Sequence, residues 1–510
     1  MKNVLLDLNI IFDYFSKKRR KKYPDSITIY DYLLKDNGCR AYIAASCIDD
    51  LKFIKYNQLL EEKPNLTKHI RYKIVYKFIQ YQLDNFQIAK TPAYIDIDLE
   101  DIEDSQIIAS AIAIDAQVVT RDKGMLEKYK NIAITPQQLI KQIEQQEKLP
   151  PSIDFANLKK QYFQLQPQIE KQMDDVLNAT SFIMGDKVKE LEQKLQAFTG
   201  AKHAITCASG TDALLLAMMA MDIQPDDEII TTPFTFIATA ETIALMKAKP
   251  VFVDIEADTY NIDATKIEAA ITHKTKAIMP VSLYGQPADM DAIQAIADKH
   301  KLKVIIDGAQ SFGSTYKGKT DSNLGDISTT SFFPAKPLGC YGDGGAVFTN
   351  NDEYAEKMRM MRVHGQNKRY HHKYIGMGGR LDTIQAAILL AKLTNYPEEI
   401  KQRQAVATTY SEKLDSSVIK PITKEERSSV WAQYSIRTKD RDQMQEKLKE
   451  AGIPTAVHYP MPLHLQECFQ YLNYKEGDFP VAESMCNEIM SLPMNPFLTP
   501  QETNRICTAI

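Results

Sequence analysis

The chain has 510 residues, of which 44% are hydrophobic and 25% charged, with a formal net charge of −4. This length predicts two to four domains, and the small charge gives no global field that would attract nucleic acid. Seven cysteines without paired spacing favour reduced thiols and a cytoplasmic protein, while no apolar run approaches the roughly 20 residues of a membrane helix.

The first predicted domain spans residues 1–145. A short strand at 3–8, helices such as 67–86 and a closing strand at 116–120 indicate a small α/β domain. Polar residues and two prolines then interrupt the helical pattern and predict a linker over residues 146–152.

A larger α/β domain is predicted over residues 153–395. Short apolar runs alternate here with helical stretches such as 289–300, an order typical of a mostly parallel, doubly wound sheet. From residue 396 to residue 510 a long polar helix leads into a small α+β domain with a predicted strand at 434–437. The apolar runs are residues 228–231, 250–254, 277–281 and 303–307.

Lys336 lies in a loop rich in Ser, Pro and Gly, and Asp307 ends an apolar run. An enzyme that uses pyridoxal phosphate (PLP) needs such a pair. The lysine amine forms a Schiff base with the cofactor aldehyde, and the carboxylate keeps a proton on the pyridine nitrogen. The helix start at Gly210-Thr211 offers N–H groups to a phosphate, and Phe236 can lie on the ring. Each residue alone has an ordinary structural explanation, but together they favour a PLP site.

Four segments resemble signatures of the DegT/DnrJ/EryC1/StrS family of sugar-nucleotide aminotransferases: residues 185–192, 234–241, 283–291 and 380–387. The resemblance runs from about residue 153 to the C-terminus and implies a fold-type I PLP-dependent transferase. It implies that Lys336 carries the Schiff base and moves protons, and that Asp307 pairs with the pyridinium nitrogen. The other cofactor contacts it implies are Gln310 on the ring hydroxyl, Phe236 on the ring face, and Gly210, Thr211 and Ser331 on the phosphate.

The segments 333–345 and 362–372 look closest to a subgroup that aminates UDP-2-acetamido-2-deoxy-3-oxo-glucuronate or related 3-oxo sugars. The resemblance implies ping-pong transfer from glutamate to a keto sugar nucleotide, for surface polysaccharide biosynthesis. It also implies a homodimer or higher homo-oligomer with shared active sites. The substrate carboxylate and diphosphate need cations and donors, for which the candidates are Arg380, His364, His371, His458 and Tyr459.

Gly378 departs from the family pattern, because many members have an Asn there that reaches a neighbouring subunit's phosphate. The loss of one amide donor is expected to weaken phosphate binding by about 1–2 kcal/mol.

Four acids of the first domain follow predicted strands or lie on adjoining helices: Asp7, Asp50, Asp104 and Asp122. Their oxygens suit Mg²⁺ or Mn²⁺, and two such ions could activate water against a phosphodiester. Their order resembles the PIN domain, a nuclease fold, with either Asp49 or Asp50 at the second position. A set of helix caps is the alternative. The basic run 17–22 could hold RNA phosphates or form a solvated turn.

Two further interpretations stay open. The chain could be an RNA-processing or regulatory protein, with a PIN-like ribonuclease domain and a PLP domain that acts as a sensor. PLP-fold regulators usually carry a helix-turn-helix, which is not visible in this sequence. Alternatively, the PIN-like domain could be a structural appendage that aids oligomerisation. A dehydratase is disfavoured, because that branch of the family has histidine in place of Lys336.

Overall fold

The structure is a computed structural model, and it describes residues 3–7, 10–11, 29, 40–44, 47, 55, 87–89, 102–114, 116–148 and 153–510. The chain divides into two compact units, Met1–Pro151 and Ser152–Ile510. The predicted helix 67–86, the basic run 17–22 and the acids Asp49 and Asp50 lie outside the described residues. Within the described ranges, no helix has the length and apolar character that a membrane crossing requires.

The first unit contains a parallel five-stranded sheet of order β3-β2-β1-β4-β5. The predicted strand at 116–120 is followed by one more, the two-residue strand β5, which is too short to give a periodic signal. Apolar side chains of β1 and β4 form the core beneath α6 and α7. The strands are β1 Asn3–Leu6, β2 Arg40–Ala44, β3 Gln87–Ala89, β4 Gln117–Val119 and β5 Ala133–Ile134, and the helices are α6 Ile102–Ala113, α7 Lys123–Lys128 and α8 Pro136–Lys148.

The second unit is built on a seven-stranded sheet of order β6-β14-β13-β10-β9-β7-β8. All its strands run parallel except β14, which pairs antiparallel with both neighbours. The sheet is therefore mixed, and the predicted parallel character holds for six strands. Their bounds are β6 His203–Cys207, β7 Glu228–Thr231, β8 Lys249–Phe252, β9 Thr275–Ile278, β10 Lys303–Asp307, β13 Ile327–Ser331 and β14 Gly345–Thr349.

Helices cover this sheet, and most begin at polar caps. Asp289 caps α14 by accepting from Ala292 N at 3.2 Å, because a side-chain oxygen satisfies an N–H that the first helical turn leaves free. The helices are α9 Leu158–Ala179, α10 Asp186–Thr199, α11 Gly210–Ala220, α12 Ala238–Leu245, α13 Ala264–Ile267, α14 Met290–His300, α15 Asp352–Met361, α16 Thr383–Lys413, α17 Arg441–Glu450, α18 Pro480–Glu488 and α19 Pro500–Ala509.

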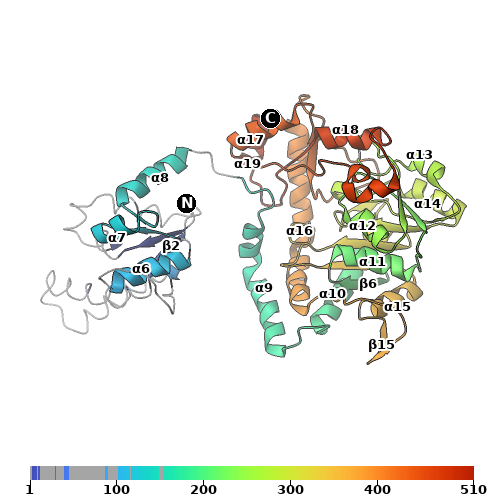
Figure 1. Ribbon diagram of the computed structural model, residues 1–510, viewed down its shortest axis with the longest axis horizontal. Helices are drawn as coiled ribbons and strands as arrows, with labels where there is room; N and C mark the ends of the chain where they lie inside the picture. The colour runs from blue at the N-terminus through green and yellow to red at the C-terminus, as the bar shows by residue number, and fades with distance from the viewer. Residues whose placement is uncertain are drawn as a thin grey trace. The chain divides into compact units, whose positions relative to one another are not determined.

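The long helix α16 connects the two parts of this unit and packs beside α9 (Figure 1). The predicted border between residues 395 and 396 lies inside α16. The smaller part carries an antiparallel pair, β17 Tyr434–Arg437 and β18 Ile489–Leu492. Two short hairpins complete the unit, β11 Thr315–Tyr316 with β12 Lys319–Thr320, and β15 Gln366–Lys368 with β16 His371–His372.

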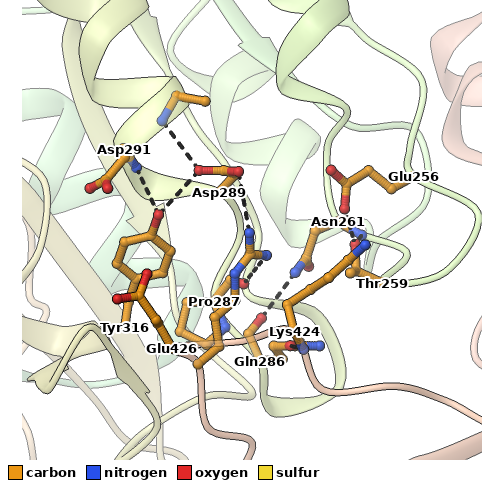
Figure 2. A network of polar contacts seen from close by, with 12 residues as sticks. Glu256, Thr259, Asn261, Gln286, Pro287, Asp289, Asp291, Tyr316, Lys424 and Glu426 are labelled. Carbon is orange, nitrogen blue, oxygen red and sulfur yellow. Dashed lines mark hydrogen bonds and ion pairs between the residues drawn. The ribbon is translucent and has the colours of Figure 1, made fainter.

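A network of polar contacts joins residues 424–427 to the larger part of the unit (Figure 2). Arg427 lies 3.3 Å from Asp289 and donates to Pro287 O at 3.2 Å, and Lys424 N donates to Gln286 Oε1 at 2.7 Å. The Tyr316 hydroxyl also donates to Asp289, at 3.2 Å. The network fixes the chain that leads from α16 into β17 against the loops at one end of the sheet.

Candidate active site

The predicted site residues gather at one edge of the seven-stranded sheet. Asp307 ends β10 and Ser331 ends β13, while α11 starts just after β6 and Phe236 follows β7. These four strands run parallel to one another. Their carboxyl ends therefore meet at the same edge, which is where α/β sheets place ligand sites.

Asp307 is held in a fixed position by its surroundings. Its side chain is 4% exposed. One oxygen accepts from Thr239 Oγ1 at 2.7 Å, and the other accepts from Ala309 N at 3.2 Å. The Thr239 hydroxyl and the backbone N–H together fix the orientation of this buried carboxylate, which lies at the carboxyl end of β10. Thr239 is a site residue that the sequence analysis missed, although it lies within the segment 234–241 that carried the resemblance.

Lys336 lies in the loop between β13 and β14, and its side chain is partly buried. Its backbone N–H donates to Phe333 O at 2.9 Å. Burial lowers the pKa of its amine, because a charged group loses hydration there, and the Asp307 carboxylate opposes this by favouring the ammonium. The structure thus brings the two predicted catalytic residues within electrostatic reach.

Gln310 links three parts of the site. Its Oε1 accepts from Tyr284 N at 2.7 Å, and its Nε2 donates to the Tyr459 hydroxyl at 3.1 Å. Burial, followed by the Asp307 charge, raises the pKa of Tyr459, so this phenol keeps its proton. Tyr459 comes from the smaller part of the unit and brings that part to Asp307 and Gln310. Tyr284 was not predicted as a site residue.

The first turn of α11 lies against the end of β13. A Cβ on Gly210 would lie 2.7 Å from Ser331 Cβ, a distance that only glycine permits. Ser209 caps the helix by accepting from Asp212 N at 3.0 Å. The partly exposed Thr211 and the hydroxyl of Ser331 therefore flank a helix N-terminus, which favours an anion.

Phe236 is 55% exposed, so the ordinary explanation of a core phenylalanine is wrong. Its ring centroid lies 6.3 Å from that of Tyr459. A large aromatic ring beside Tyr459, at the edge that carries Asp307, offers a free face to a flat ligand.

Two of the predicted substrate-binding residues lie together. A Cβ on Gly378 would lie 3.3 Å from the His364 ring and 3.8 Å from an Arg380 nitrogen. His458 donates to or accepts from Ser491 Oγ at 3.0 Å, and burial, followed by the Lys336 charge, lowers its pKa. His371 is exposed on the β15–β16 hairpin, where the Nδ1 of its neighbour His372 lies 2.8 Å from His364 O.

Two of the predicted acids of the first unit, Asp7 and Asp122, follow the carboxyl ends of β1 and β4. Thr120 Oγ1 donates to Asp7 Oδ2 at 2.7 Å and accepts from Asp122 N at 2.9 Å. Asp122 also caps α7 by accepting from Met125 N at 2.8 Å, as the alternative of helix caps expects. Asp104 lies in α6. Among the described residues no group of three metal-ligating side chains is found.

Comparison with known proteins identifies relatives of the second unit. A model of the DegT/DnrJ/EryC1/StrS aminotransferase family matches residues 164–510. UDP-2-acetamido-2-deoxy-3-oxo-D-glucuronate aminotransferase of Pseudomonas aeruginosa is 50% identical over 359 residues, which cover 70% of this chain and 99% of the relative. A pleiotropic regulatory protein of Geobacillus stearothermophilus is 48% identical over 363 residues, which cover 70% and 98%.

A crystal structure of NtdA from Bacillus subtilis with bound cofactor PMP is similar at a TM-score of 0.66 and 30% identity, over 70% of this chain and 84% of that chain. The family match spans both Lys336 and Asp307, and the mixed sheet supports the fold-type I α/β architecture expected from the sequence. The chain therefore belongs to the DegT/DnrJ/EryC1/StrS aminotransferase family.

Proposed function

We propose that this protein is a PLP-dependent aminotransferase that moves an amino group from glutamate to a UDP-linked 3-oxo sugar. The observation that carries the proposal is that buried Asp307, at the carboxyl edge of the sheet, lies near enough to the amine of partly buried Lys336 for its charge to act on it. The Pseudomonas relative's name supplies the sugar class. The product would serve surface polysaccharide biosynthesis, and the working form would be a homodimer or higher homo-oligomer.

The donor set fits PLP. Gly210 leaves a cradle that a Cβ would fill, and Thr211 and Ser331 flank it for the phosphate. Asp307 offers an oriented carboxylate to the ring nitrogen, Gln310 a side-chain amide, and the exposed Phe236 a stacking face. When bound, PLP would accept electrons from the substrate carbon that loses a proton.

Lys336 is the proton carrier in this proposal. Its lowered pKa leaves more of the amine neutral near neutral pH, so that Nζ can take a proton and return it. The fixed Asp307 carboxylate stabilises the protonated Nζ. One residue thus serves both halves of a ping-pong cycle, one with glutamate and one with the sugar.

Arg380 and His364 would bind the acidic part of the sugar nucleotide, since they lie together at Gly378. A guanidinium pairs with a carboxylate or a diphosphate through two parallel hydrogen bonds. His371, His458 and Tyr459 are proposed as further contacts. With glycine at 378 the phosphate has one donor fewer than in many family members, so the affinity for PLP is expected to be lower.

The test incubates the protein with PLP, glutamate and a panel of 3-oxo and 4-oxo nucleotide sugars, and measures 2-oxoglutarate and the new amine. Amination of a UDP-linked 3-oxo sugar, with parallel double-reciprocal plots, is the expected result. Lys336→Ala should abolish turnover, and Lys373→Ala, on an exposed lysine, should not. Turnover by Lys336→Ala, or no product from any sugar, would overturn the proposal.

The name of the Geobacillus relative favours a second candidate, a regulatory protein in which the PLP site acts as a sensor. A sensor binds PLP and sugar nucleotide without consuming glutamate. Saturable sugar binding in the absence of turnover, across the same panel, would identify it.

For the first unit we propose a PIN-like domain with a metal-dependent ribonuclease site. Asp7 and Asp122 follow adjacent parallel strands and meet at Thr120, which supports a cation near Asp7. In this proposal, Asp50 and Asp104 would be the remaining ligands of a Mg²⁺ or Mn²⁺ site. RNA cleavage by the full chain that needs Mg²⁺ or Mn²⁺ and is lost in Asp7→Asn is expected. No cleavage by the wild type would leave the helix-cap interpretation.

A further inference from the structure

A buried lysine of α16 reaches the loop that carries Lys336. Lys392 is 1% exposed and among the largest fully buried side chains. Its Nζ donates to Gly339 O at 2.6 Å and lies 4.3 Å from the centroid of the Tyr341 ring. An ammonium taken out of water is costly unless it is hydrogen-bonded or placed on an aromatic face, and here both compensations come from the same loop.

This loop is a compact turn that transmits the contact. Lys336 N donates to Phe333 O at 2.9 Å, and Cys340 N donates to Phe332 O at 2.8 Å. A Cβ on Gly339 would lie 2.6 Å from Phe333 O, so the two sides of the turn touch. Holding the Gly339 carbonyl therefore restrains the side of the turn from which Lys336 projects.

The next turn of α16 reaches the other half of the site. The Tyr396 hydroxyl donates to Phe312 O at 2.5 Å, in the segment that follows Gln310. Lys392 and Tyr396 are four residues apart and lie on one face of the helix. The helix thus contacts both the loop of Lys336 and the segment of Asp307.

We infer that Lys392 is a positioning residue, whose ammonium holds the loop of Lys336 at a fixed distance from Asp307. This role rests on the proposed function, because it matters only if Lys336 is the reacting amine. Misplacement of a reacting group by about 1 Å can cost roughly 100-fold in rate, which is why a loop without regular structure needs such a restraint.

The pKa of Lys392 is shifted differently from the pKa values of the titratable groups that face it. Burial lowers its own pKa to about 8, while the Glu399 and Cys340 charges oppose the shift. Burial raises the pKa of Cys340 to about 11 and that of Tyr341 to about 12, and it raises that of Glu399. Tyr162 of α9 lies edge-on to Tyr341. Lys392 is therefore the group of this set expected to change charge near pH 8.

The experiment measures hydrogen exchange in the full chain prepared without PLP. Lys392→Met keeps the stem and removes the amine, Lys392→Gln keeps a neutral donor, and Tyr396→Phe is the control that loses a hydrogen bond one turn away. Residues 332–341 should exchange about 10-fold faster in Lys392→Met, less so in Lys392→Gln, and at the wild-type rate in Tyr396→Phe, which should instead loosen residues 310–316.

Two further readouts separate positioning from general damage. Unfolding by urea should change little in Lys392→Met, because removal of a buried charge offsets the lost hydrogen bond. In the wild type, loop exchange relative to a sheet peptide should accelerate above about pH 8, and this step should vanish in Lys392→Met. Unchanged loop exchange in Lys392→Met, or equal acceleration across the sheet, would overturn the inference. Absent turnover in the wild type would count against the proposed function alone.

Discussion

At the scale of single residues, two opposing effects set the pKa of Lys336 in the candidate site. Burial favours the neutral amine of Lys336, and the Asp307 carboxylate favours the ammonium. Neither effect alone suits a proton carrier, which must hold and release a proton in one cycle. The contacts of Thr239 and Ala309 keep that carboxylate oriented.

Removal of the Asp307 charge should lower the pKa of Lys336 further, because the carboxylate stabilises the protonated amine. In Asp307→Asn prepared without PLP, the pH curve for modification of Lys336 by an amine-reactive reagent should shift to lower pH. Peptide mass spectrometry measures it. Asp212→Asn, at the other end of the site, is the control. A shift to higher pH, or the same shift in both variants, would contradict the prediction.

At the scale of elements, the short 3-10 helix Asp321–Asn323 brings a second buried acid close to Gly308, the residue after Asp307. Asp321 is 1% exposed, and one of its oxygens accepts from Ser311 Oγ. Its other oxygen has no hydrogen-bond partner among the described residues. Burial raises the pKa of Asp321 to about 6, so the folded state binds this proton more tightly than the unfolded chain does.

This acid gives a stability prediction with a definite sign. Because the folded pKa lies above the unfolded value, the contribution of Asp321 to stability is lost as the pH rises from about 4 to about 6. Asp321→Asn should therefore be more stable than wild type at pH 7 by up to about 3 kcal/mol, with the difference closing toward pH 4. Urea unfolding followed by fluorescence of Trp431, the single tryptophan, measures it. A lower stability of Asp321→Asn than of wild type at every pH would contradict this prediction. The control is Asp298→Asn, at an exposed position.

The polar network around residues 424–427 (Figure 2) predicts that replacing Arg427 destabilises the fold more than replacing Lys317 does. Arg427 has 8% of its side chain exposed and contacts Asp289 and Pro287, whereas Lys317 is 46% exposed. Arg427→Met should lower the free energy of unfolding by about 1–3 kcal/mol, and Lys317→Met by less than about 1 kcal/mol. The same Trp431 assay compares them, and equal losses would show that burial does not set the cost.

At the scale of the whole molecule, the second unit contains the entire match to the family, residues 164–510. The Pseudomonas relative is covered over 99% of its length by 70% of this chain. Residues 152–510 also have their own cores, one of which includes Ile153.

A fragment of residues 152–510 should therefore fold and keep the turnover of the full chain. Steady-state kinetics of both proteins with glutamate and the sugar, under the same conditions, would check this. A fragment that folds, as judged by Trp431 fluorescence, but loses turnover would show that the first unit acts on the site.

Features that depend on a local sequence pattern were predicted, whereas features that depend on contacts between distant residues were missed. The strands at 228–231, 303–307 and 434–437 match to the residue, because a short apolar run between breakers is a local pattern. The direction of β14 was not predicted, since pairing is set by distant partners. Lys392 was not singled out from the sequence, because the Gly339 carbonyl and the Tyr341 ring that receive its amine are distant from it along the chain. For the first unit, no described contact tests Asp104 or Asp50.

The antiparallel strand β14 has a consequence for the order of folding. It lies between β6 and β13, so β6, which leads into α11, and β13, which ends at Ser331, take their places in one sheet through their pairings with β14. The strands β13 and β14 are neighbours in the chain, but β14 and β6 are distant in the sequence, and distant contacts form slowly because a long loop must close first. The proposed phosphate-binding residues at the start of α11 and at Ser331 should thus come together only after β6 and β14 have paired, well after residues 1–151 have left the ribosome.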